Sequence, residues 1–247
     1  IPFAILMAVK FRKDLNPTYF FFCILTVVYQ IYCGIYLGFM LVVPTALFLL
    51  ITIIGGYIFH KKKILKLVWH IKILMGIIVN VLLLIPLMLP YLERKIVANN
   101  YHFNEILHSI PTLTSYVFSH KNSLLWSILS DVGKHYEAFW DHQIFTGIIA
   151  SLSVLIAGYL VLKKALKTKF KLKKASSPSI LIIVGIITLF LFLRFDNITA
   201  YKIIYYIPGF NSMRSLTRII NVELIFFGIA TSYVFCKLFT ATKIKKE

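Results

Sequence analysis

Acidic residues are scarce in this sequence, because only 9 Asp and Glu stand against 27 Lys and Arg, which leaves a net charge of +18. Such a charge can indicate binding to nucleic acid. The lysines, however, lie at the ends of apolar runs, where the topology of a membrane protein places them. Basic stretches with interleaved aromatic residues do not occur outside those ends. We therefore expect no nucleic-acid partner.

Cysteine is also rare, with three residues and no CxxC spacing. We interpret the cysteines as small apolar packing residues rather than as disulfides or metal ligands. The alternating pattern of an outer-membrane barrel strand is absent as well. The sequence starts inside an apolar run, without an initiator Met or the basic region of a signal peptide. This start predicts that the chain is a fragment of a longer protein.

What the sequence has in abundance is apolar residues, which make up 59% of it and give a mean hydropathy of +0.83. They are gathered in runs of a length that suits a bilayer, which a helix crosses in about 20 residues. The predicted fold is therefore all-α, a multi-pass transmembrane bundle with about seven apolar segments. These segments are Ile1–Val9, Pro17–Tyr32, Gly38–Phe59, Ile71–Tyr91, Ile144–Leu162, Ile180–Leu193 and Ile219–Leu238.

The basic residues predict how this bundle is oriented. Most of them fall at alternate ends of the seven segments, and the densest group lies in residues 163–175. Because Lys and Arg concentrate on the cytoplasmic side, the 163–175 loop and the C-terminus are predicted to be cytoplasmic. The chain then divides into transmembrane helices at 1–91, an extracytoplasmic loop at 92–143 and further transmembrane helices at 144–247. Membrane lipids are the surroundings that this arrangement requires.

The long loop is expected to contain short interfacial helices. Asn104 is a candidate N-cap, and Asn122 is another. After Asn122, apolar residues recur at helical spacing over 124–132, with serines on the other face and Trp126 on the flank. This pattern predicts an amphipathic helix that lies on the outer membrane surface.

The densest group of ionisable residues in the chain is the stretch 135–142, which contains Glu137, Asp141 and His142. Such a group can bind a divalent cation, act in acid–base chemistry or contact a substrate. It can equally be a solvated polar loop. Its spacing matches no zinc motif, so a divalent cation is an open alternative and no cofactor is assigned.

A second candidate site follows the turn signal Pro208-Gly209. Arg214 and Arg218 are four residues apart and would share a face if their segment were helical. Two guanidinium groups at the outer mouth of a span suit a lipid phosphate or pyrophosphate, which Arg binds through two parallel hydrogen bonds. Anchoring to lipid headgroups, or pairing with Glu223, explains them as well.

Three stretches together resemble bacterial membrane glycosyltransferases of the GT-C type, in particular the YfhO-like group. Tyr29 to Gly38 is similar to that group's Q-x(n)-Y-L-G hairpin. The outer-loop pattern runs from Thr114-Ser115-Tyr116 through Ser123-Leu124-Leu125-Trp126 to Asp141-His142-Gln143-Ile144-Phe145-Thr146-Gly147. The third stretch is Pro208-Gly209-Phe210 with Met213-Arg214 and Arg218. Asp141, Leu216 and Ile219 depart from the group's usual Glu, Pro and Phe.

The resemblance implies a transferase in the cytoplasmic (inner) membrane that uses a polyprenyl-phosphate-linked sugar on the outer face, for a cell-envelope glycan or glycolipid. The family's catalytic carboxylate lies near its N-terminus, upstream of the matching part, so no catalytic residue is assigned here. Arg214, Arg218, Asp141, His142 and Glu137 are the expected contacts with substrate or phosphate. The alternatives are a lipid-linked glycan transporter or flippase, an O-antigen polymerase-like protein and a non-catalytic assembly partner.

Overall fold

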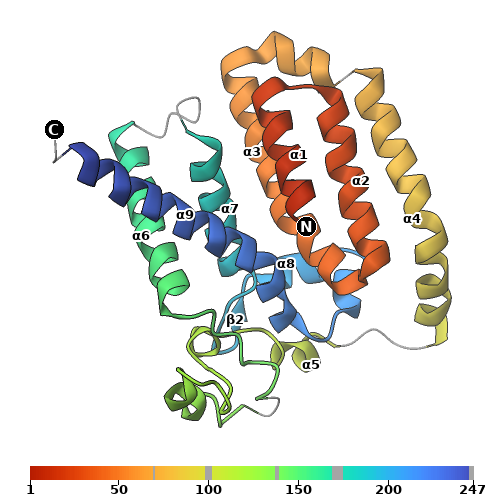
Figure 1. Ribbon diagram of the computed structural model, residues 1–247. Coiled ribbons are helices and arrows are strands. Elements are labelled where there is room, and N and C mark those ends of the chain that lie inside the picture. Colours follow the sequence, from red (N-terminus) through yellow and green to blue (C-terminus); the bar gives the residue numbers. More distant parts are fainter. Residues whose placement is uncertain (69, 98–101, 137–138, 169–174, 245–247) are drawn as a thin grey trace. The chain divides into compact units, whose positions relative to one another are not determined.

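The computed structural model describes residues 1–68, 70–97, 102–136, 139–168 and 175–244 (Figure 1). Apart from one two-stranded hairpin, the secondary structure of these residues is helical, so the predicted all-α class is confirmed. The longer helices are α1 (Pro2–Asp14), α2 (Pro17–Cys33), α3 (Ile35–Val68), α4 (Ile71–Val97), α6 (Ile148–Lys167), α7 (Ser177–Leu191) and α9 (Ile220–Ile244). The short elements are α5 (Phe103–Leu107), η1 (Thr114–Tyr116), η2 (Ser127–Asp131), β1 (Arg194–Phe195), β2 (Ile198–Thr199), α8 (Tyr201–Tyr205), η4 (Phe210–Ser212) and η5 (Leu216–Ile219).

A helix covers most of each of the seven predicted apolar segments, and among the described residues four segments are long and apolar enough to cross a membrane. These four are Ile35–Ile58, Ile71–Pro90, Ile148–Lys167 and Leu216–Thr240. Helices α1, α2 and α7 have 13, 17 and 15 residues. At about 1.5 Å per residue they fall short of a hydrocarbon layer about 30 Å thick. Four candidate spans fit a membrane protein, whereas the seven-span arrangement is not confirmed.

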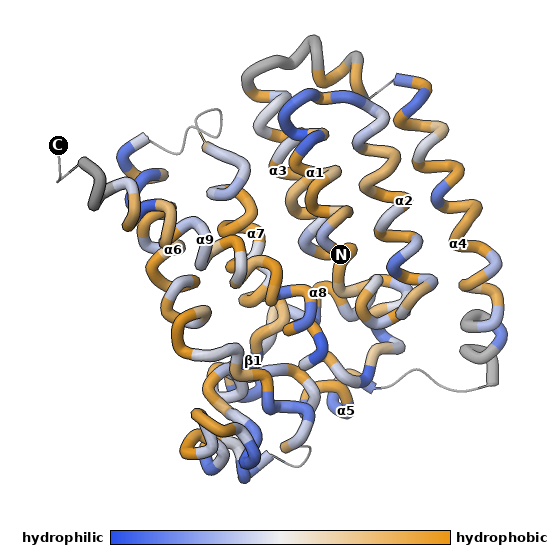
Figure 2. The backbone as a smooth tube through the Cα atoms, viewed as in Figure 1, coloured by the Kyte–Doolittle hydropathy of each residue, from blue (hydrophilic) through white to orange (hydrophobic). Residues whose placement is uncertain are grey.

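The chain divides into two compact units, and each is described separately. Unit 1 comprises residues 1–99 and 159–184, and unit 2 comprises residues 100–158 and 185–247. The division falls within α6 and α7. Figure 2 shows apolar residues along most of α4 and α6. Only 17% of the apolar window of α4 is buried, which leaves an apolar face of the kind that lipid covers.

Unit 1 begins with the hairpin of α1 and α2, and local sequence explains its turn. Leu15 adopts a left-handed conformation with φ of 52° and ends α1. Asn16 then caps α2, because its Oδ1 accepts a hydrogen bond from the Thr18 amide at 2.9 Å. Pro17 fits the first helical position, where no amide hydrogen is needed.

Helices of unit 1 pack closely at two glycines, Gly38 and Gly76. A Cβ added at Gly38 would lie 2.4 Å from the Cα of Ile31, so α2 and the start of α3 approach each other at backbone distance. Near the other end of α2, Gly76 of α4 lies close to Phe21. The Tyr32 hydroxyl also donates to the Leu83 carbonyl at 2.6 Å, which joins α2 to α4.

Unit 2 folds the long loop around a small core of its own. Ile106, Ile110 and Phe118 are almost completely buried there. The Phe145 amide donates to the Phe118 carbonyl at 3.3 Å, which ties the end of the loop to its middle. In the same unit α7 packs closely on α9, where a Cβ at Gly185 would lie 2.7 Å from that of Phe226. The part of the loop that the structure describes is therefore folded around its own core.

Two local predictions in the loop are wrong. Helix α5 begins after His102 rather than after Asn104, and the Glu105 carboxylate accepts from the His102 amide at 3.2 Å. The predicted amphipathic helix over 124–132 is only the short 3₁₀ element η2 preceded by turns. Tertiary contacts of the loop compete with the helical spacing of this segment. The Ser119 amide donates to the Leu129 carbonyl, which holds the segment close to Phe118.

Candidate functional site

His142 belongs to unit 2 and has no exposed surface. Its Nε2 is 2.9 Å from the carbonyl oxygen of His108, which can only accept, so Nε2 carries the proton. Its Nδ1 is 2.8 Å from Ser115 Oγ, and the Thr112 amide donates to the same Oγ. Burial lowers the pKa of His142, and the positive charge of Arg194 also acts in that direction. His142 is therefore a neutral imidazole whose two ring nitrogens are occupied, which favours a positioning role.

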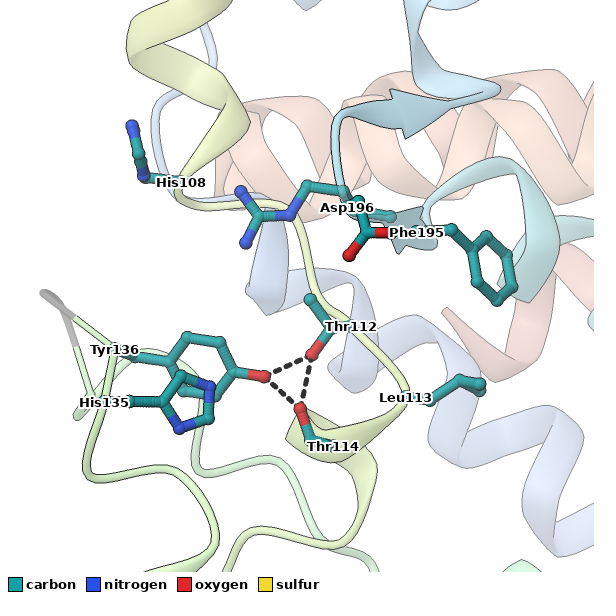
Figure 3. Close-up of a pocket in the computed structure, with 9 residues that line it drawn as sticks. His108, Thr112, Leu113, Thr114, His135, Tyr136, Phe195 and Asp196 are labelled. Carbon is teal, nitrogen blue, oxygen red and sulfur yellow. Dashed lines mark hydrogen bonds between the residues drawn. The ribbon is translucent and has the colours of Figure 1, made fainter.

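Tyr136 covers His142. The two rings are stacked, with centroids 4.2 Å apart and an angle of 12° between their planes. The Tyr136 hydroxyl is hydrogen-bonded to Thr112 Oγ1 and to Thr114 Oγ1, which are 2.8 Å from each other. Three hydroxyl groups therefore meet at one point, as Figure 3 shows.

Arg194 brings a guanidinium group to the same region from the hairpin that follows α7. Strands β1 and β2 pair in antiparallel register around the two-residue turn Asp196-Asn197. The φ of 48° at Asp196 has the sign that the first position of such a turn requires. The Arg194 amide donates to the Pro111 carbonyl at 2.8 Å, and its Nη1 donates to the Leu107 carbonyl at 2.8 Å. The loop carrying α5 is thus joined to the hairpin by backbone and side chain.

Tyr136 and Arg194 line a cavity of about 470 Å³, which is within the size range of small-molecule sites. Figure 3 shows its lining, with Tyr136 and His135 on one side and Phe195 and Asp196 on the other. The lining residues are His108, Thr112, Leu113, Thr114, His135, Tyr136, Arg194, Phe195 and Asp196. The arrangement offers many hydrogen-bond donors, one permanent cation and one carboxylate.

A second polar contact joins the loop to a candidate membrane span. The Tyr116 hydroxyl donates to Glu223 Oε2 at 2.7 Å. Glu223 lies in the first turn of α9 and is 1% exposed. Burial, together with the nearby carboxylate, holds the pKa of Tyr116 well above its usual range, so the phenol keeps its proton. Glu223 is thus hydrogen-bonded to Tyr116.

The predicted phosphate contacts lie at the start of α9. Arg214 and Arg218 are both exposed. The condition for a shared face, a helical segment, is not met, because Ser215 between them has non-helical angles and η5 begins only at Leu216. Before this segment, Gly209 has φ of 95° and the Phe210 amide donates to the Ile207 carbonyl in a type II turn. The turn itself is confirmed.

Asp141 is brought to this segment by the tertiary structure. Ser215 Oγ donates to Asp141 Oδ2 at 3.5 Å, at the long limit of a hydrogen bond. The half-buried Asp141 therefore lies beside the Arg214–Arg218 segment, whereas its neighbour His142 turns inward. Glu137, the fifth predicted contact, lies outside the described residues. Among the residues that are described, no group of three His, Cys, Asp or Glu could hold a metal ion.

Sequence reasoning missed Arg194, Thr112 and Thr114 as site residues. Arg194 looked like one more basic residue at the end of a span, and the two threonines have no motif around them. The signal that could have pointed to Arg194 is the Arg-Phe-Asp-Asn sequence directly after an apolar run, which combines a cation with a hairpin turn. The distances that join these residues come only from the fold.

No protein-family model matches the chain, and no curated protein or solved structure shows a significant match to it.

Proposed function

We propose that the chain is part of an integral membrane glycosyltransferase of GT-C type, which uses a polyprenyl-phosphate-linked sugar on the outer face of the cytoplasmic membrane. The observation that carries this proposal is the meeting of Asp141 with the Arg214–Arg218 segment at the start of the candidate span Leu216–Thr240. Guanidinium groups at that position suit the phosphate of a lipid carrier whose chain lies in the bilayer.

The topology in this proposal has all seven segments in or at the membrane, with the C-terminus in the cytoplasm. One contact in unit 1 supports it. Arg12, at the basic end of α1, donates to the carbonyl of Ala175 at 3.0 Å, just before α7. Two ends that the charge pattern assigns to the cytoplasmic side are therefore neighbours.

In the proposed reaction the Arg214–Arg218 segment binds the carrier phosphate, and Asp141 contacts the sugar or the acceptor. Ser115, Tyr136 and His142 hold the loop that carries Asp141. The ordered core of unit 2 gives this loop a fixed geometry, which positioning of two substrates requires. The catalytic carboxylate is left unassigned.

The test measures the release of polyprenyl phosphate from a radiolabelled polyprenyl-phosphate sugar in membranes that contain the full-length transferase of which this chain is proposed to be a part. The double variant Arg214→Gln and Arg218→Gln should abolish release without lowering the amount of protein in the membrane. Lys134→Gln is the matched control, because Lys134 is an exposed cation of the same unit that pairs with Asp131. Full activity of the double variant would overturn the proposal.

A transporter of lipid-linked glycans is the second candidate, favoured by polar groups buried within helices. Asn80 in α4 is 1% exposed, and its Oδ1 has no hydrogen-bond partner among the described residues. Buried polar atoms in spans often mark a transport pathway. The same labelled donor separates the two functions, because a transporter moves it across a vesicle membrane without cleaving the sugar–phosphate bond.

A further inference from the structure

The cavity around Arg194 is not explained by the proposed contacts at Asp141, Arg214 and Arg218, none of which lines it. Almost all of its polar lining groups can donate a hydrogen bond. They are one guanidinium, two imidazoles and three hydroxyls, from Arg194, His108, His135, Thr112, Thr114 and Tyr136. A cavity with this lining is complementary to a ligand with several acceptor oxygens.

Arg194 has unused capacity in this cavity. Its Nη1 is occupied by the Leu107 carbonyl, but its Nε is buried and has no hydrogen-bond partner among the described residues. No carboxylate of the described residues lies within salt-bridge distance of the guanidinium, although Asp196 also lines the cavity. Because Nε has almost no accessible surface, a ligand in the cavity cannot reach it, and Nη2 is the remaining nitrogen that can donate to a bound acceptor; no hydrogen bond of Nη2 is present among the described residues.

The hydroxyl groups complement this cation. Thr112, Thr114 and Tyr136 bond to one another, and each O–H can rotate toward a ligand oxygen without leaving a backbone group unpaired. Asp196 is an acceptor and would repel a bare anion, but it can accept from a ligand hydroxyl. Phe195 and Leu113, which are 47% and 57% exposed, add apolar surface at the rim.

We propose that this cavity binds the phosphate of a phosphorylated polyol, with Arg194 and the three hydroxyls on the phosphate oxygens and Asp196 on a neighbouring hydroxyl. Two sources fit this chemistry: a soluble sugar phosphate and the phosphate headgroup of a lipid. The inference goes beyond the proposed transferase and does not require it, because binding here depends on none of Asp141, Arg214 and Arg218.

The experiment is titration calorimetry on the full chain in detergent micelles, with glucose 1-phosphate as the soluble probe and free glucose as the uncharged comparison. Arg194→Gln should weaken phosphate binding at least about tenfold, the loss expected when a charge-assisted hydrogen bond is removed. Lys134→Gln is the matched control and should leave the Kd unchanged, because Lys134 is an exposed cation of the same unit that does not line the cavity. Loss of binding in Arg214→Gln with full binding in Arg194→Gln would overturn the inference but support the proposed transferase.

Arg194 also supports the loop through Leu107, so a second variant is needed. Thr114→Val removes one hydroxyl of the cavity, and Thr114 is exposed and not part of the Arg194–Leu107 contact. It should weaken phosphate binding several-fold while the thermal unfolding temperature stays near that of the wild type. Unchanged phosphate binding in both Thr114→Val and Arg194→Gln would overturn the inference.

A second experiment, in lipid nanodiscs, distinguishes the two sources of the phosphate. The protein is placed in phosphatidylcholine nanodiscs with or without phosphatidylglycerol, whose headgroup carries a phosphate and free hydroxyls, and its unfolding temperature is measured. A rise with phosphatidylglycerol that Arg194→Gln removes, without binding of glucose 1-phosphate, identifies a lipid headgroup. Binding of glucose 1-phosphate without that rise identifies a soluble ligand. Binding of neither probe overturns the inference.

Discussion

The hydroxyl of Tyr116 donates to the carboxylate of Glu223 across 2.7 Å, although the two residues are 107 positions apart in the chain. Tyr116 belongs to η1 of the folded loop, and Glu223 belongs to the first turn of the candidate span α9. The other carboxylate oxygen of Glu223 has no partner among the described residues. The phenol of the loop thus donates the hydrogen bond that one oxygen of this buried carboxylate accepts at the start of a candidate span.

Removal of the Tyr116 hydroxyl group should destabilise unit 2. Tyr116→Phe leaves both oxygens of Glu223 without the donor that the structure shows, and an unsatisfied buried group costs about 1–3 kcal/mol. We expect a lower unfolding temperature in detergent, whereas Tyr206→Phe should change little because Tyr206 is 71% exposed. Combining Tyr116→Phe with Glu223→Gln should cost less than the sum of the single changes. An unchanged unfolding temperature for Tyr116→Phe would contradict this reading.

Lower pH should decrease the stability of the folded loop through protonation of His142. Burial lowers the pKa of folded His142, so the unfolded loop binds this proton more tightly than the folded loop does. The contribution to stability is therefore complete above the ordinary histidine pKa of about 6.5 and is lost as pH falls through that value toward the folded pKa. Proteolysis of the loop should accelerate as the pH decreases across this range.

The control for this pH effect is His120→Gln, because His120 is an exposed histidine of the same loop. That variant should keep the pH dependence of the wild type. His142→Gln should be cleaved faster at neutral pH, since Ser115 and the His108 carbonyl lose their ring partner. Its cleavage rate should then depend on pH only through the protease itself. A wild type with the same pH profile as His142→Gln would show that His142 does not titrate on unfolding.

Gly133 should tolerate no side chain. A Cβ at this position would lie 2.1 Å from Cδ1 of Phe118, whose ring is 1% exposed and surrounded by the loop core. Gly133→Ala should therefore cost about 1–3 kcal/mol through overpacking. Gly228→Ala in α9 is the control, because a Cβ there meets nothing within 4 Å and alanine favours a helix. Hydrogen exchange of the loop amides should rise in the first variant only.

The exposed apolar segment 124–128, which runs into the start of η2, should touch the membrane interface. Leu124, Leu125 and Ile128 are 95%, 74% and 83% exposed, and Trp126 lies among them. In a variant whose only tryptophan is Trp126, brominated lipid should quench its fluorescence. Replacing Leu124 and Ile128 by Ser should reduce that quenching, whereas Leu113→Ser, at the rim of the cavity, should not. Equal quenching in both variants would contradict contact between this segment and lipid.

The sequence by itself determined the helices, because apolar runs, Asn16 with Pro17, and Pro208-Gly209 act through local chemistry and composition. It did not determine the exact helix ends, and with them which helices are long enough to cross a membrane: α2 ends at Cys33 before the extended Gly34, and α7 ends at Leu191. The prediction of a helix over 124–132 is wrong, because the pairing of Ser119 with Leu129 competes with the local helical spacing.

The site was decided by tertiary structure. Asp141 and His142 are adjacent in sequence, yet one faces the Arg214–Arg218 segment and the other is buried against Ser115. Arg194 reaches the loop only because the hairpin after α7 pairs with Pro111. Such contacts join residues from 27 to 107 positions apart. No periodicity or motif carries that information, because it depends on how the loop core and the hairpin pack against each other.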